Sequence, residues 1–166
     1  MMQMAFTRRY SAAHRFLNSQ SPQCQVPHGH NWFVTITVEA AKPSPLDGDI
    51  NMVAEFKAAK SAWHSWVDTH MDHTFQINAA DPRIAYFKDN EPQQLRRLLL
   101  TPGDPTTEVL AALWQAKAQA FMDAAGGHLI VSKVHLEETP TNSVILSGAR
   151  AYAAHLPPEA SAPQWY

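Results

Sequence analysis

The sequence predicts an α+β fold built as one domain. Four segments have the alternation or composition of β-strands, two have the spacing of amphipathic helices, and no linker or internal repeat divides the chain. In chain order the elements are strand, strand, helix, helix, strand and strand. The segments expected to form them are 4–17, 32–40, 51–70, 105–125, 128–138 and 143–153.

The composition is that of a folded globular chain. The 166 residues are 45% hydrophobic and 17% charged, which supplies one sizeable core and excludes general disorder. The formal net charge is −2, so the strong basic excess that is typical of nucleic-acid-binding proteins is missing. No apolar run reaches the length of a membrane span, and the N-terminus does not resemble a signal peptide. The single cysteine, Cys24, excludes a disulfide within the chain, and together these features predict a cytoplasmic protein without nucleic-acid or membrane partners.

The second strand and the first helix are predicted from periodicity. The stretch WFVTITVEA alternates between polar and apolar residues, and its apolar side carries Trp32, Val34, Ile36, Val38 and Ala40. The following AKPSPLDGD (41–49) is a break rich in Pro, Gly and Asp. Asn51 is then expected to cap a helix that runs to about His70. Its apolar residues have helical spacing and are Val53, Phe56, Trp63, Trp66 and Val67.

A long insertion separates the two helices. Residues 79–104 contain three prolines and mixed charge without a clear period, so we expect a surface excursion with a short helical piece at QQLRRLLL. Asp104 and Pro105 are expected to begin the second helix, as N-cap and first-turn proline. Gly126 and Gly127 are expected to end it. The buried face of this helix is expected to carry Leu110, Leu113, Trp114, Ala118 and Phe121.

The last two strands form a predicted hairpin. The stretches 128–138 and 143–153 are separated by TPTN, which is typical of a turn. One side of the first of these strands is expected to carry Ile130, Val134, Leu136 and Glu138. The domain is expected to span 1–155, followed by a loosely held, Pro-rich tail at 156–166.

The most informative motif is an H-x-H pair, His28 and His30. In an extended chain these side chains point to the same side, so both imidazoles can reach one metal ion. A third nitrogen ligand would leave a fourth position open for substrate, and His14 on the preceding strand is the leading candidate. Taken alone, an H-x-H pair is more often a surface or hydrogen-bonded pair, and a single histidine is more often simply half-buried.

Two further motifs carry acid–base groups. In Asp72-His73, the aspartate can hold the imidazole in one tautomer for proton transfer, although an Asp-His pair after a helix is also typical of a turn. Glu138 lies on the apolar side of a predicted strand, where a carboxylate is costly unless it is paired. A ligand with two adjacent N–H donors would pair with it; alternatively, this is a solvated strand end.

Taken together, these residues resemble the 6-pyruvoyltetrahydropterin synthase family, from Phe6 to about Tyr152. The similarity is greatest to its bacterial branch, the 6-carboxytetrahydropterin synthases, because only three residues separate Cys24 from His28. The motifs are Ser11-Ala-Ala-His14-Arg15, Cys24-x3-His28-Gly-His30-Asn31, Met52-Val-Ala-Glu55-Phe56-Lys57, Asp72-His73 followed by Ile77-Asn78, Pro105-Thr-Thr-Glu108 and Glu138-Thr139.

The resemblance implies a tunnelling fold (T-fold), in which a four-stranded antiparallel sheet carries two helices on one face, and a homohexamer made of two trimers. It implies that zinc is the cofactor and binds to His14, His28 and His30. Cys24 would be the catalytic base, assisted by Asp72 and His73. The pterin substrate would be bound by Glu138, Thr106, Thr107 and Glu108.

The activity implied by the resemblance is that of a lyase on 7,8-dihydroneopterin triphosphate. Triphosphate and acetaldehyde are lost and 6-carboxytetrahydropterin is formed for queuosine biosynthesis. Two alternatives stay within the family: a pyruvoyl product, or a hydroxymethyldihydropterin product. A third alternative is a non-catalytic metal-binding protein on the same scaffold. Since such a protein would tolerate the loss of Cys24, Asp72 and His73, and all three are present, we favour catalysis.

Overall fold

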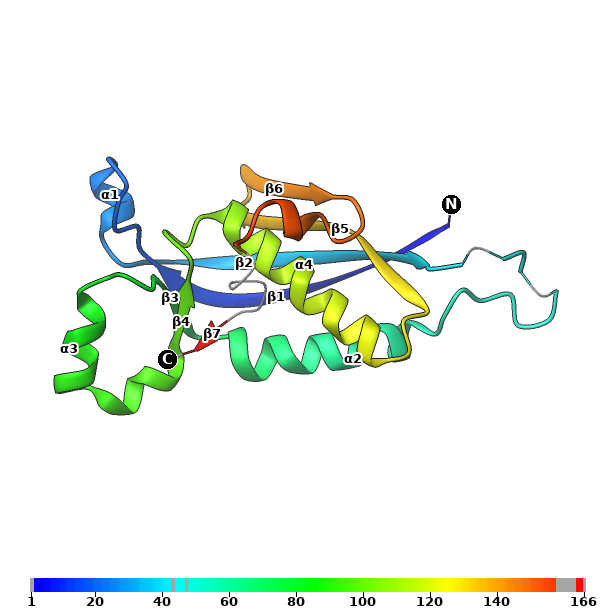
Figure 1. Ribbon diagram of the computed structural model, residues 1–166, viewed down its shortest axis with the longest axis horizontal. Helices are drawn as coiled ribbons and strands as arrows, with labels where there is room; N and C mark the ends of the chain where they lie inside the picture. Colours follow the sequence, from blue (N-terminus) through cyan, green and yellow to red (C-terminus); the bar gives the residue numbers. More distant parts are fainter. Residues whose placement is uncertain (1, 43, 47, 158–163, 166) are drawn as a thin grey trace.

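The computed structural model describes residues 2–42, 44–46, 48–157 and 164–165, and these form one sheet with helices packed on it (Figure 1). The sheet order is β6-β5-β2-β1-β3-β4-β7. The strands are β1 Gln3–His14, β2 His28–Ala40, β3 Thr74–Asn78, β4 Leu98–Thr101, β5 Leu129–Thr139, β6 Asn142–Ser147 and β7 Gln164–Trp165. The α-helices are α1 Pro22–Gln25, α2 Phe56–Trp66, α3 Arg83–Asn90 and α4 Thr107–Ala124. A π-helical turn, Val67–Met71, continues α2, and 3₁₀ segments lie at Pro92–Arg97 and Ala151–Ala154.

The four strands expected from the sequence form the antiparallel part of this sheet. β1 pairs with β2, β2 with β5, and β5 with β6, all antiparallel. The α+β class and the antiparallel core are therefore confirmed. β3 and β4 extend the sheet with parallel pairing, and β7 adds a short antiparallel edge. The sequence analysis did not predict these three strands, because segments of two to five residues are too short to show a period.

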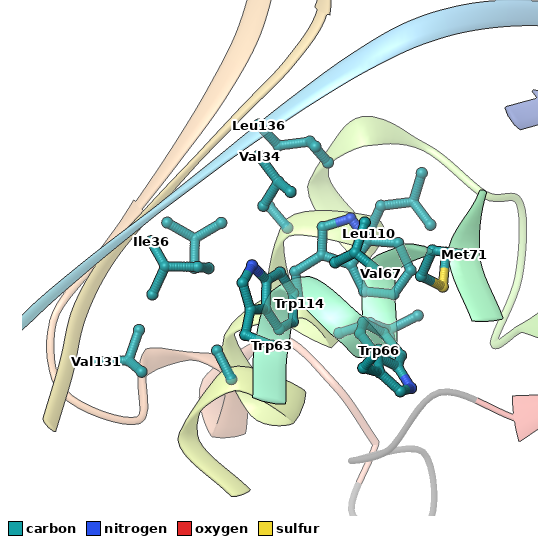
Figure 2. Close-up of a cluster of buried hydrophobic side chains, with 14 of the residues drawn as sticks. Val34, Ile36, Trp63, Trp66, Val67, Met71, Leu110, Trp114, Val131 and Leu136 are labelled. Carbon is teal, nitrogen blue, oxygen red and sulfur yellow. The ribbon is translucent and has the colours of Figure 1, made fainter. Parts of the chain in front are cut away.

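The core lies between the sheet and the two long helices. Three tryptophans, Trp63 and Trp66 of α2 and Trp114 of α4, are each 7% exposed or less and lie in one cluster with sheet residues such as Val34 and Ile36 (Figure 2). The ring centroids of Trp63 and Trp66 are 5.2 Å apart. Such large aromatic groups contribute much of the buried apolar area. They hold one face of β1 and β2 against the helices.

Both long helices begin later than predicted. α2 starts at Phe56, not at Asn51, because Asn51 has left-handed backbone (φ 58°) and its Oδ1 accepts the Gly48 N–H (2.9 Å), which closes a turn. For α4 the N-cap is Thr106, whose hydroxyl accepts the Val109 N–H. Asp104 lies outside that helix, so its predicted role as N-cap was wrong.

The ends of α4 and of the last hairpin also differ in detail. α4 ends at Ala124, before two glycines with positive φ (103° and 68°), which confirms the predicted stop. Where β5 pairs with β2, the register shifts between Thr37 and Val38, and Val131 is buried in place of the expected Ile130. β6 ends at Ser147, earlier than predicted. Of the expected tail, residues 158–163 and 166 lie outside the described residues, and β7 pairs with β4.

The segment 79–104 contains regular structure. It forms α3, a 3₁₀ turn and β4, and the expected helical piece QQLRRLLL is divided between the last two. Ile84 of α3 packs with Ile77 and Leu98 in a small second core. The helix was missed because only one of its residues is buried, so its sequence carries no amphipathic period.

A buried ion pair ties this segment to the end of β1. The Arg15 Nη1 lies 3.2 Å from the Asp81 Oδ2, and the side chains are 10% and 0% exposed. The Asp81 Oδ1 also accepts the Arg83 N–H (2.9 Å) at the start of α3. One carboxylate therefore fixes both α3 and the residue that follows His14.

We predict that Asp81→Ala lowers the free energy of unfolding by about 3–5 kcal/mol, because it leaves the Arg15 guanidinium buried without a partner. Urea unfolding followed by circular dichroism measures this. Asp89→Ala, which removes an exposed carboxylate on α3, is the control and should change stability by less than about 0.5 kcal/mol. Equal stability of the two variants would contradict a stabilising role for the pair.

Candidate functional site

Three histidines meet where β1 ends and β2 begins. His14, the last residue of β1, pairs directly with His28, the first residue of β2, and His30 follows two positions along on the same side. The ring centroid of His14 lies 4.5 Å from that of His28 and 5.1 Å from that of His30. One nitrogen from each ring lies within 4.8 Å of the other two. The structure thus brings together the three predicted metal ligands.

Two backbone carbonyls fix which nitrogen of each ring carries the proton. The His14 Nδ1 lies 3.0 Å from the Pro105 carbonyl oxygen, and the His28 Nδ1 lies 2.8 Å from the Val26 carbonyl oxygen. Because a carbonyl only accepts, each Nδ1 must donate, and the Nε2 of each neutral ring holds a lone pair. These two Nε2 atoms face each other at 3.0 Å. Two facing lone pairs at this distance fit a cation bound between them. Histidine ligands of metals typically have this arrangement, in which one ring nitrogen donates to a carbonyl and the other binds the metal.

Burial lowers the pKa of two of these histidines. His14 is fully buried, and desolvation lowers its pKa to about 4. Burial also lowers the pKa of His30, although the Glu138 carboxylate opposes this effect. Because only a neutral imidazole binds a metal, few protons compete with a metal ion for the nitrogens of His14 and His30.

Glu138 lies beside the three histidines. Its Oε1 is 3.6 Å from the His14 Nε2 and 4.0 Å from the His30 Nε2, and its side chain is 19% exposed. The carboxylate is therefore mostly buried, which argues against the alternative of a solvated strand end. Arg9 and Asn31 line the same hollow of about 630 Å³.

The second predicted pair, Asp72 and His73, follows the π-helical turn. The Asp72 Oδ2 accepts from the His73 Nδ1 (2.7 Å), and the Asp72 Oδ1 accepts the Ser11 N–H (2.8 Å). Burial raises the pKa of Asp72, but the hydrogen bonds from Ser11 and His73 outweigh it, so that this pKa lies below its usual value. The ionised carboxylate orients an imidazole that is 78% exposed.

The backbone of His73 is also held in place. His73 has left-handed backbone (φ 61°), and its N–H donates to the Ser11 carbonyl oxygen (2.7 Å). Its ring lines an open hollow of about 500 Å³ together with His30 and Asn31. The pair therefore presents the Nε2 of His73 to a space that also borders a candidate metal ligand.

The structure does not connect Cys24 to these groups within one chain. Cys24 lies in α1, on the loop between His14 and His28, and its carbonyl oxygen accepts the Phe16 N–H (2.8 Å). Among the described residues, no hydrogen bond joins its side chain to the three histidines or to His73. Figure 1 shows α1 beyond the ends of β1 and β2, at the end of the molecule where β3 and α3 also lie.

Thr106, Thr107 and Glu108 form the start of α4, directly after the Pro105 carbonyl that binds His14. Their chain position places them close to the cluster, but the Thr106 hydroxyl is engaged as the helix N-cap.

Sequence reasoning missed the residues that support this site. Asp104 accepts the N–H groups of Leu17 (2.9 Å) and Asn18 (2.8 Å) and the side-chain amide of Asn78 (2.9 Å). It thereby fixes the segment that carries the Pro105 carbonyl. Asn31, whose Oδ1 accepts from Arg9 (2.6 Å), was part of a noted motif but received no role. The sequence shows a helix-start signal at Asp104, but it does not show which groups the Asp104 carboxylate binds.

None of the described helices is both long enough and apolar enough to span a membrane.

Residues 3–149 match the family model described as 6-pyruvoyl tetrahydropterin synthase. Among curated proteins, the 6-carboxy-5,6,7,8-tetrahydropterin synthase of Rickettsia felis is 29% identical over 137 residues, covering 81% of this chain and 93% of that protein. The enzyme of the same name from Bacillus subtilis is 29% identical over 132 residues, covering 80% of this chain and 75% of that protein.

Solved structures show the same fold at lower identity. An uncharacterised protein of Wolinella succinogenes has a TM-score of 0.71 at 18% identity, covering 88% of this chain and 97% of that chain. The 6-pyruvoyl tetrahydropterin synthase of Caenorhabditis elegans has a TM-score of 0.59 at 22% identity, covering 89% and 96%. That of Plasmodium falciparum has a TM-score of 0.66 at 17% identity, covering 89% and 98%.

We predict that His28→Ala binds the metal too weakly to retain it through dialysis, because one of the three imidazole ligands is lost. Elemental analysis after dialysis should find about one metal ion per chain in the unaltered protein and almost none in the variant. His155→Ala, which removes an exposed histidine elsewhere, is the control and should keep the full complement. A full metal content in His28→Ala would exclude His28 as a ligand.

Proposed function

The chain belongs to the 6-pyruvoyl tetrahydropterin synthase family of enzymes, and on this basis we propose that it is a zinc-dependent lyase acting on 7,8-dihydroneopterin triphosphate. With one molecule of water consumed, the products would be 6-carboxy-5,6,7,8-tetrahydropterin, triphosphate and acetaldehyde. The observation that carries this proposal is the cluster of His14, His28 and His30, in which two Nε2 lone pairs are aimed at one point by backbone carbonyls.

Zinc suits this donor set. Three imidazoles with room for a further ligand are typical of catalytic zinc sites, whereas magnesium and calcium prefer oxygen ligands. When bound, zinc would supply Lewis-acid chemistry, polarising oxygens of the substrate side chain and making the adjacent C–H more acidic.

Cys24 is proposed as the base that removes this proton. The thiolate is the reactive form of cysteine, and a cation close to the sulfur favours it. Cys24 lies on the loop that begins after His14 and ends before His28, so the ligands at both ends of the loop limit where the thiol can go.

Asp72 and His73 are proposed to assist Cys24 by moving the proton. The ionised Asp72 holds the Nδ1–H of His73, which leaves its Nε2 free to accept a proton and to return it. This is the usual pairing of a base with an orienting carboxylate. Within one chain, His73 borders the same hollow as His30. The family resemblance implies that the sites lie at subunit interfaces. At such an interface, Cys24 of one protomer would meet the Asp72–His73 pair of another.

Glu138 is proposed to bind the pterin ring. A carboxylate accepts two parallel N–H bonds, which matches the edge of a pterin ring that carries adjacent N–H donors. Thr106, Thr107 and Glu108 are proposed to contribute to the same subsite. A homohexamer in the cytoplasm and a role in queuosine biosynthesis complete the proposal.

We expect zinc-loaded protein to convert 7,8-dihydroneopterin triphosphate to 6-carboxytetrahydropterin with release of acetaldehyde, both identified by mass spectrometry. The reaction should stop in a sample treated with chelator. A pyruvoyl or hydroxymethyl product would contradict the proposed product while keeping the pterin lyase class. Zinc binding without turnover would favour a non-catalytic metal-binding protein.

We predict that Cys24→Ala lowers kcat by at least about a hundredfold, the scale of general acid–base catalysis, while zinc content stays unchanged. The measurement is steady-state turnover together with elemental analysis of the same sample. Gln23→Ala, on the same short helix, is the matched control and should keep its activity. Unchanged turnover in Cys24→Ala would remove Cys24 from the mechanism.

A further inference from the structure

We propose that Glu138 is a fourth ligand of the metal in the substrate-free enzyme, and that the pterin substrate competes with the metal for this carboxylate. The inference rests on the proposed function, since it takes the three-histidine cluster as a metal site. It adds that this site is closed at rest and is opened by the substrate.

Three of the distances around the cluster are close to those of a four-ligand site. With metal–ligand bonds of about 2.0–2.2 Å, the ligand atoms of a tetrahedral zinc site stand about 3.3–3.5 Å apart. The Glu138 Oε1 lies 3.6 Å from the His14 Nε2 and 4.0 Å from the His30 Nε2, and the two histidine Nε2 atoms described above are 3.0 Å apart. These three distances lie within about 0.7 Å of the tetrahedral values. His28 and Glu138 have to move closer together by side-chain rotation for all four groups to coordinate one ion.

The protonation of the facing atoms also favours a metal ion between Glu138 and His14. The His14 Nε2 carries no proton, because its Nδ1 donates to the Pro105 carbonyl oxygen. It therefore cannot donate to the Glu138 carboxylate that faces it. No hydrogen bond to this carboxylate occurs in the described part of the chain, and Arg9 in the same hollow donates to Asn31 instead. A mostly buried carboxylate that faces the lone pair of the His14 Nε2 is stabilised by a cation between them.

The backbone of β5 is irregular at this residue. In the pairing of β5 with β6, Glu137 lies opposite Ser143 and Thr139 opposite Asn142, so Glu138 is the extra residue of a β-bulge. Bulges re-aim a side chain and are frequent next to active sites. Here the bulge leaves Glu138 outside the β5–β6 ladder, with its carboxylate directed toward His14 and His30. Its neighbour Glu137 instead has its Oε1 3.9 Å from the His135 Nδ1.

The two roles of Glu138 exclude each other. A carboxylate that accepts two adjacent N–H groups of a pterin ring uses both oxygens in the plane of the ring edge. It cannot at the same time keep Oε1 on the metal. Binding of the pterin ring therefore has to detach Glu138, and a coordination position becomes free only when substrate is present.

The test uses cobalt(II) in place of zinc, because cobalt reports its ligands through visible absorption. We compare the unaltered protein, Glu138→Gln and the matched control Glu137→Gln. Glu138→Gln should bind cobalt at least about tenfold more weakly in a chelator competition and should change the absorption spectrum. Glu137→Gln should match the unaltered protein in both measurements. The pterin 7,8-dihydroneopterin, which lacks the triphosphate, should shift the spectrum of the unaltered protein toward that of Glu138→Gln.

Two results would overturn the proposal. One is a Glu138→Gln protein with unchanged cobalt affinity and an unchanged spectrum; the other is an equal loss of affinity in both variants. Neither result would affect the lyase function, which is tested separately by product analysis and by His28→Ala. An unaltered protein that binds no cobalt or zinc would instead overturn both the metal site and the role of Glu138.

Discussion

The pairing of β1 with β2 is the constraint on which the site depends. Their ladder runs from Gln3 opposite Glu39 to His14 opposite His28, and its last pair is the first pair of metal-ligand candidates. Because side chains alternate along a strand, a slip of one residue would turn His28 and His30 to the other face of the sheet. The tryptophan core fixes this register from the helix side, so packing at the centre of the molecule sets the position of two imidazoles at its end.

The rest of the site comes from backbone groups that hold side chains in one orientation. The Pro105 and Val26 carbonyls hold His14 and His28, and the backbone N–H of Ser11 holds Asp72. Backbone groups are good orienting partners because secondary structure and tight loops restrict them, and Asp104 restricts the loop before α4 in this way. A chain that folds correctly therefore already has His14, His28 and the Asp72–His73 pair oriented, without further ordering of long side chains.

The sequence was informative where one residue type repeats at a short spacing. The alternation at 32–40 predicted β2, and the same period placed His28 and His30 on one side. The sequence was uninformative where the interacting residues are distant from each other along the chain. β3 and β4 are too short to show a period, and their parallel pairing joins segments that come together only on folding. Asp104 shows the same limit, since an aspartate before proline signals a helix start, while its actual partners, Leu17, Asn18 and Asn78, are far away in sequence.

The left-handed backbone of His73 has a consequence for evolutionary change at this position. Such a conformation costs a non-glycine residue on the order of 1–3 kcal/mol, and glycine, asparagine and aspartate adopt it more readily. Replacement by glycine or asparagine would relieve this strain, so stability alone gives a histidine no advantage at position 73. On grounds of folding, substitutions at this exposed position should therefore be tolerated more readily than substitutions of the fully buried His14.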